Sequence, residues 1–170
     1  CGAESRRRMT DIICFHNPDE ENGYLSNWYP SRFVVDDVDF SSMEQYMMYR
    51  KACCFSDVET AARILETDDV AEIKHLGRRV AGYDDHVWNG VRQIEVYEGL
   101  LAKFSQNAEL GAQLEVTGTA LLAECAVKDR IWGIGLSMCD PARLDSAQWR
   151  GQNLLGYALM LTRGKLNRID

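Results

Sequence analysis

The chain has 170 residues, 46% hydrophobic and 26% charged, a balance typical of one soluble globular domain. A formal net charge of −7 gives no general attraction to polyphosphate backbones, and no apolar stretch approaches the roughly 20 residues that span a bilayer. The six cysteines form no Cys-x-x-Cys pair, which favours free thiols in a reducing, cytoplasmic setting. Composition thus argues against a membrane protein, a disulfide scaffold and a nonspecific nucleic-acid binder.

Short strands and turns are expected at the start of the chain. We treat residues 1–8 as a flexible extension and expect one domain over residues 9–170. A first strand is expected over residues 11–15, followed by a polar loop. Two further short strands, over residues 33–35 and 38–40, flank Asp36-Asp37 and so predict a tight β-hairpin.

Capping residues predict three helices in the middle of the chain, over residues 43–54, 57–66 and 69–76. Ser41 or Ser42 caps the first, Ser56 or Asp57 begins the second, and Gly77 serves the third as a C-cap.

Helical spacing predicts a longer helix from Asp84 or Asp85 to about residue 105. Its apolar face is expected to contain Val87, Trp88, Val91, Ile94, Leu101 and Phe104. The remaining elements are a helix over residues 107–117, a strand over 120–124 and a final helix over 148–166. The predicted class is α+β, a mostly helical single domain with a small β-sheet.

The most informative local feature is a pair of charged residues, Glu44 and Lys51, seven positions apart on the first predicted helix. Seven residues make nearly two turns, so both side chains point to the same face. Helical side chains lean toward the N-terminus, so Lys51 reaches back toward Glu44. A carboxylate and an amine can therefore share one pocket, although spacing alone favours a solvated surface pair.

Other candidate residues have an ordinary structural interpretation beside a functional one. Residues 128–135 (KDRIWGIG) combine Asp129, a stacking face on Trp132 and two glycines, and a plain turn explains them as well. Trp88 lies on an apolar stripe and is favoured as a core residue. Arg78, Arg79 and Arg92 can serve one phosphate, or can simply be solvated. His16, His75 and His86 lack metal-ligand spacing, so no metal site is expected.

Six ordered blocks resemble the NADAR (YbiA-like) family, and together they span nearly the whole chain. They are residues 25–30 (LSNWYP), 42–52 (SMEQYMMYRKA), 76–80 (LGRRV), 88–92 (WNGVR), 129–135 (DRIWGIG) and 149–156 (WRGQNLLG). The sequence departs from the family pattern at Gln45, where many members have histidine, and at Met47-Met48, where they have Phe-Gln. These departures concern the choice of substrate and leave the chemistry intact.

The resemblance implies an N-glycosidase that cleaves the C1′–N bond between a phosphorylated ribose and a nitrogenous base. Family members split ribosylamino-pyrimidine intermediates of riboflavin synthesis or remove ADP-ribose from guanine in nucleic acid. The catalytic candidates are Lys51, Glu44 and Asp129, with Lys51 as a nucleophile that forms a Schiff base and the two acids dividing the roles of anion and proton donor.

The resemblance also suggests which residues bind the substrate. The candidates are Asn27, Gly77, Arg78, Trp88, Arg92, Trp132, Gly133 and Asn153. Asn27 and Asn153 would bind sugar hydroxyls, the arginines and Gly77 the phosphate, and the tryptophans the base. The expected partner is a small ribosyl phosphate or an ADP-ribosylated nucleic acid, with no cofactor, metal, membrane or obligate protein partner. The alternative is a non-catalytic sensor module that binds ADP-ribose or NAD.

Overall fold

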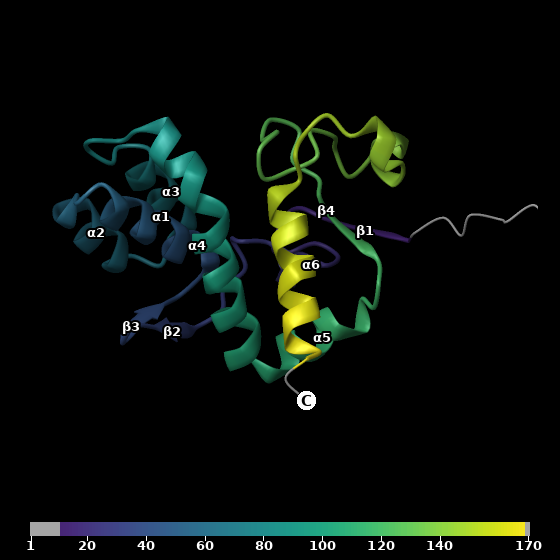
Figure 1. The fold of residues 1–170 in the computed structure, drawn as a ribbon, viewed down its shortest axis with the longest axis horizontal. Coiled ribbons are helices and arrows are strands. Elements are labelled where there is room, and N and C mark those ends of the chain that lie inside the picture. Colours follow the sequence, from purple (N-terminus) through teal and green to yellow (C-terminus); the bar gives the residue numbers. More distant parts are fainter. Residues whose placement is uncertain (1–10, 169–170) are drawn as a thin grey trace, which may run out of the picture.

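The computed structural model describes residues 11–168, and their backbone forms an α+β fold (Figure 1). The strands are β1 (Ile12–Phe15), β2 (Phe33–Val35), β3 (Val38–Phe40) and β4 (Leu121–Glu124). The helices are α1 (Met43–Cys54), α2 (Val58–Leu65), α3 (Val70–Gly77), α4 (Asp85–Gln106), α5 (Ala108–Val116) and α6 (Leu154–Leu166). Short 3-10 helices cover Gly23–Leu25, Pro141–Leu144 and Ser146–Gln148. The predicted class is confirmed, whereas the domain boundary expected at residue 9 lies outside the described residues.

The helices form two groups around the long helix α4. Helices α1, α2 and α3 pack together on one side of it, and α6 runs beside it on the other, next to β1 and β4 (Figure 1). None of the helices within residues 11–168 combines the length and apolar character required to cross a bilayer.

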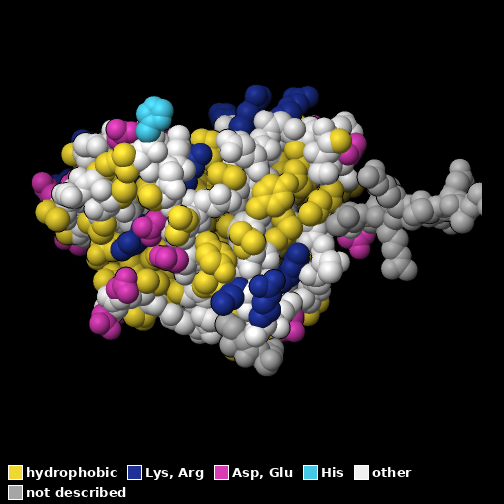
Figure 2. All heavy atoms as spheres, in the orientation of Figure 1, with side chains coloured by type: hydrophobic (Ala, Val, Ile, Leu, Met, Phe, Trp, Pro, Cys, Tyr) yellow, Lys and Arg dark blue, Asp and Glu magenta, His cyan; other side chains and the backbone are white. Residues whose placement is uncertain are grey.

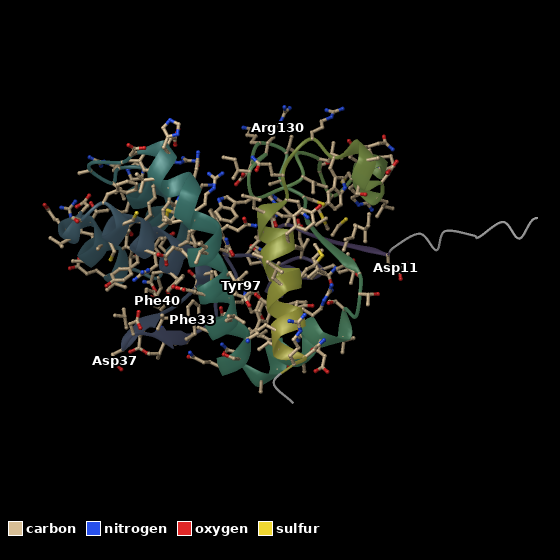
Figure 3. The ribbon with its side chains drawn as sticks, viewed as in Figure 1. Asp11, Phe33, Asp37, Phe40, Tyr97 and Arg130 are labelled. Carbon is tan, nitrogen blue, oxygen red and sulfur yellow. The ribbon has the colours of Figure 1, made fainter. Side chains whose placement is uncertain are left out.

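Two separate two-stranded sheets complete the fold. Strand β1 pairs with β4 in parallel, with Phe15 opposite Glu124. Strands β2 and β3 form the predicted antiparallel hairpin, in which Asp36 and Asp37 have φ values of 51° and 62°. Two successive positive φ values define a type I′ turn, whose twist matches that of paired strands. Phe33 and Phe40 stack at a centroid distance of 5.7 Å and anchor the hairpin to the core (Figure 3).

The helix starts follow the predicted capping chemistry. Side-chain oxygens of Ser42, Asp57, Asp69 and Asp84 accept hydrogen bonds from backbone N–H groups in the first turns of α1, α2, α3 and α4. Gln45 tightens the start of α1 further: its Oε1 accepts from the Ser41 N–H at 2.7 Å, and its Nε2 donates to the carbonyls of Ile64 and Thr67. This amide therefore ties the beginning of α1 to the end of α2.

The end of α3 differs from the prediction. Gly77 still belongs to the helix, and the C-cap is Arg78, which has a φ of −72°. A glycine is required for a different reason, because a Cβ atom at this position would overlap the side chain of Met48. Gly77 thus lets α3 approach α1 closely and is not a left-handed cap.

The apolar face of α4 is also rotated from the predicted one. Val87 and Ile94 are 46% and 61% exposed, whereas Val96 and Leu100 are fully buried. Trp88 and Phe104 are buried as expected. The helix packs against α1 and α6 on different sides, so its buried face follows both neighbours and not a single stripe.

The final helix begins at Leu154, not at residue 148. Asn153 has a φ of 53°, which interrupts the helical path. The segment before it instead pairs with the loop after β4, through backbone N–H groups that donate to the carbonyls of Arg130, Gly133 and Ile134. The first two residues of α6 donate to the carbonyls of Ile131 and Trp132 in the same loop. This pairing fixes the loop that contains Asp129.

Candidate active site

One cavity of about 460 Å³ lies between the helical group and the paired strands β1 and β4. Its helical wall comes from α1, α3 and α4, and its opposite wall from the ends of β1 and β4, the loop after β4 and the first turn of α6. The three predicted catalytic residues, Glu44, Lys51 and Asp129, all line it. Residues from distant parts of the sequence therefore meet around one space.

Glu44 is a buried acid in the first turn of α1. Only 5% of it is exposed, and no residue between 11 and 168 gives its side chain a hydrogen bond. Its backbone N–H donates to the Asn27 carbonyl at 2.9 Å, which holds the loop that contains Asn27 against the start of α1. Burial raises the pKa of Glu44 to about 7; Lys74 opposes this effect and the negative charge of Asp129 adds to it. A carboxyl of this kind can hold a proton at neutral pH.

Lys51 is half-buried and points into the same cavity. Its Nζ donates to the Gly77 carbonyl at 2.8 Å and lies 4.5 Å from the centroid of the Tyr83 ring. Burial lowers the pKa of Lys51, and the negative charges of Asp85 and Glu44 oppose that effect. The side chain is therefore held in a fixed position and does not extend into open solvent.

Asp129 faces these two residues from the loop after β4. Its Oδ1 accepts the backbone N–H groups of Ile131 at 3.0 Å and Trp132 at 2.9 Å. The charge of Asp129 raises the pKa values of both Glu44 and Glu124. The loop thus presents a fixed carboxylate whose charge acts on two other acids of the cavity wall.

Five of the predicted substrate-binding side chains also line the cavity: Asn27, Arg78, Trp88, Arg92 and Trp132. Two of them contain buried polar atoms without a hydrogen-bond partner among the described residues, namely Asn27 Oδ1 and Arg92 Nε. The Arg92 guanidinium lies 5.8 Å from the centroid of the Trp132 ring. Unpaired buried polar atoms are rare and costly, so these two are candidates for ligand contacts.

The other three predicted binding residues do not line the cavity. Gly77 contributes a carbonyl to Lys51 and otherwise packs against α1. Gly133 is buried where an added Cβ would meet the Asp129 and Glu124 carbonyls. Asn153 is fully buried, and its side chain accepts from the Glu124 N–H and donates to the Leu122 carbonyl. The expected sugar contact of Asn153 therefore does not match its position, because its side chain is used to hold the backbone of β4.

Sequence reasoning missed several residues of the cavity wall, above all His16, Glu124 and Lys74. His16 directly follows β1 and Glu124 ends β4, so parallel pairing of the two predicted strands would have brought them together. Gln45, by contrast, is a family departure that does not line the cavity, whereas Met47 and Met48 do.

A buried lysine fixes the loop that leads to Asn27. Lys103 on α4 is fully buried, and its Nζ donates to the carbonyls of Tyr24 at 2.7 Å and Ser26 at 3.3 Å. The aromatic rings of Phe104 and Tyr29 lie 5.0 Å and 5.6 Å from the same nitrogen. This lysine positions the loop, and no motif around it in the sequence indicates that role. Across residues 11–168, no three His, Cys, Asp or Glu side chains are grouped to hold a metal ion.

Comparison with known proteins independently supports the family resemblance and the glycosidase activity that it implies. The NADAR domain matches residues 14–167. An N-glycosidase of Acanthamoeba polyphaga mimivirus is 35% identical over 89% of this chain and 94% of its own length. A riboflavin biosynthesis protein of Vibrio vulnificus is 33% identical over 93% of this chain, which covers 39% of that longer protein. The NMR structure of Escherichia coli YbiA has a TM-score of 0.78 at 28% identity, and the match covers 95% of this chain and 88% of that one.

Fold and cavity together with these relatives define an enzyme of the glycosidase class. The relatives named N-glycosidases include YbiA of Escherichia coli, which is 29% identical over 91% of this chain and 88% of its own length, and whose solved structure shares the fold. The chain belongs to the NADAR domain family. The family resemblance derived from the six sequence blocks is confirmed.

Proposed function

We propose that this chain hydrolyses the C1′–N bond between a phosphorylated ribose and a nitrogenous base. The observation that carries the proposal is the single cavity that brings together a buried carboxyl, a half-buried amine and a second carboxylate, those of Glu44, Lys51 and Asp129. Cleavage of this bond builds positive charge at C1′ and negative charge on the departing nitrogen. The site therefore needs an anion near the sugar and a proton donor near the base.

The two acids divide these roles. Glu44 fits the proton donor, because a pKa raised to about 7 keeps part of its carboxyl protonated at neutral pH. Asp129 fits the anion, because two backbone N–H groups fix one of its oxygens and leave the other for the cavity. Each role follows from the surroundings of the carboxyl and not from its residue type.

Lys51 fits the nucleophile, since burial favours its neutral amine. In the proposed step the bond from C1′ to the ring oxygen breaks, and that oxygen takes the proton of the glycosidic nitrogen. The Lys51 nitrogen bonds to C1′, and the bond from C1′ to the base nitrogen breaks. The base nitrogen leaves with a proton from Glu44, which gives a Schiff base between Lys51 and the sugar. Water then adds to C1′ and returns a proton to Glu44, the bond to Lys51 breaks, and the free sugar and amine are regenerated.

Two bases remain candidates for the departing group. The Vibrio vulnificus relative is named a riboflavin biosynthesis protein, which supports a ribosylamino-pyrimidine. Arg78 and Arg92 on the helical wall support a longer ADP-ribose linked to guanine. Figure 2 shows further Lys and Arg side chains along the upper edge of the molecule, where Figure 3 places Arg130. Incubation with each substrate, followed by chromatography of the released base, separates the two. A calorimetric signal for ADP-ribose without turnover of either would favour the sensor alternative.

A cytoplasmic setting belongs to the same proposal. Phosphorylated ribosides carry charge that retains them behind membranes, so the enzyme would meet them inside the cell. The chemistry proposed here uses protein side chains and water, and calls for no cofactor or obligate protein partner.

Borohydride trapping tests the proposal directly. Incubation with substrate and borohydride should reduce the Schiff base and leave a sugar adduct whose mass and position identify Lys51. Lys128→Ala is the matched control, because Lys128 is exposed beside Asp129 and does not line the cavity. We expect the adduct in this control and none in Lys51→Ala. Full activity in Lys51→Ala would contradict the assignment of the nucleophile.

A further inference from the structure

A second group of polar side chains lines the cavity opposite Glu44 and Lys51. His16 Nδ1 and Glu124 Oε1 are 3.0 Å apart, and both residues lie on the wall formed by the paired strands. Glu124 is mostly buried, and its second oxygen, Oε2, has no hydrogen-bond partner among the described residues. The catalytic steps above use neither residue.

The fold holds this pair in place through its backbone. His16 follows Phe15, the last residue of β1, and Phe15 pairs with Glu124 at the end of β4. The side chain of Asn153 accepts the Glu124 N–H at 3.1 Å and also donates to the Leu122 carbonyl. Polar groups at the carboxyl ends of parallel strands are a common location for ligand contacts. Asn153 therefore acts on the cavity by positioning Glu124.

The hydrogen bond between the two side chains decides which atoms remain for a ligand. The hydrogen bond to Glu124 and the charge of that carboxylate raise the pKa of His16, which favours imidazolium beside carboxylate. In this arrangement His16 Nδ1 donates to Glu124 Oε1, Glu124 Oε2 is an acceptor and His16 Nε2 carries a donor proton. The pair thus presents one acceptor and one donor side by side.

This pattern fits a heterocyclic base better than a phosphate. Glu124 and Asp129 place negative charge on this wall, and that charge repels a phosphate. The cations that suit a phosphate, Lys74, Arg78 and Arg92, lie on α3, at its C-terminal end, and on α4. An acceptor beside a donor matches a base edge on which an N–H group neighbours a carbonyl.

We propose that His16 and Glu124 form the subsite for the departing base, in which Glu124 Oε2 accepts an N–H group and His16 Nε2 donates to the neighbouring carbonyl oxygen. This inference rests on the proposed glycosidase function and assigns the base end of the same cavity. The ligand class is a base with adjacent N–H and C=O groups, as in guanine or an aminopyrimidinedione. An unpaired buried carboxylate oxygen would otherwise be a net cost to the fold.

Inhibition by separate fragments of the substrate tests this subsite. Guanine and 5,6-diaminouracil serve as base probes, and ribose 5-phosphate as the sugar probe. Binding is read both as inhibition of hydrolysis and as quenching of the tryptophan fluorescence of Trp28, Trp88 and Trp132, which line the cavity. For Glu124→Gln and for His16→Leu we expect base probes to bind about tenfold to a hundredfold more weakly and ribose 5-phosphate to bind within about twofold of wild type.

A surface variant tests whether base binding depends on contact with His16 and Glu124 or only on nearby negative charge. Glu20 raises the pKa of His16 through its charge but does not line the cavity, so Glu20→Gln should leave base binding unchanged. His16 is 42% exposed, so its replacement tests the subsite even where Glu124→Gln fails to fold. Base probes that bind every variant equally, or that fail to bind the wild-type protein, would overturn this inference. Absence of hydrolysis by the wild type would instead overturn the glycosidase proposal, because fluorescence reports base binding without turnover.

Discussion

Replacement of the buried acid Glu44 by glutamine should change how stability depends on pH. The folded protein keeps a proton on this carboxyl up to about pH 7, whereas an unfolded glutamate releases it near pH 4.5. Stability from this difference is therefore fully present below pH 4.5 and is lost as the pH rises through about 7. The gap between the two pKa values corresponds to roughly 3 kcal/mol, which the neutral amide of Glu44→Gln does not lose.

Urea unfolding at pH 5 and pH 8, followed by circular dichroism, measures this effect. The stability of Glu44→Gln relative to wild type should rise by about 2–3 kcal/mol between the two pH values, or roughly 5–10 °C in Tm for a chain of this size. Comparison across pH cancels any packing cost of the amide itself. The same variant should lose nearly all glycosidase activity while remaining folded.

A second glutamate provides the control. Glu98 is exposed on α4, so Glu98→Gln should show no such dependence on pH. A stability difference for Glu44→Gln that stays constant from pH 5 to pH 8 would refute the reasoning, because it would mean that the Glu44 carboxyl titrates as it does in water.

Three structural residues give further predictions. Gly77→Ala forces a Cβ atom into the side chain of Met48 and should cost about 1–3 kcal/mol in thermal unfolding; an unchanged Tm would show that the Met48 side chain moves aside without cost. Gln45→Ala leaves three backbone groups near α1 without their partner and should cost about 3 kcal/mol in urea unfolding; an unchanged midpoint would contradict this. Asn153→Ala removes two hydrogen bonds to β4 and should lower both stability, by about 2 kcal/mol, and kcat, since Glu124 loses its backbone support. An effect on stability alone would show that Asn153 does not position the cavity wall.

Local signals in the sequence predicted the secondary structure well. The caps at Ser42 and Asp84 and the turn at Asp36-Asp37 depend on chemistry within a few residues, so the sequence contains all the information they need. The late start of α6 was missed because it depends on pairing with a loop that precedes it by many residues. Elements whose ends are set by tertiary contacts could not be located from periodicity.

The candidate site also combines residues that local sequence signals predict with residues that only tertiary contacts bring together. Glu44 and Lys51 share a helix, so their convergence follows from helical geometry. The charge pair of His16 and Glu124 depends on the parallel pairing of two strands that are far apart in the chain, and nothing near either residue indicates it. Asn153 lies within a family-like block, which led us to expect a ligand contact. Its side chain instead hydrogen-bonds to the backbone of β4, and this long-range contact leaves no local signal in the sequence.

The parallel pairing of β1 with β4 also bears on how the enzyme is made. A ribosome that has released β1 must still synthesise α1 to α5 before the partner strand β4 emerges, and α6, which completes the cavity, comes later still. Contacts between such distant segments carry a large loop-closure cost and form late in folding. Nascent chains that stop before α6 should therefore be inactive, and Lys51 would face Asp129 only after β4 and the loop that follows it have been synthesised.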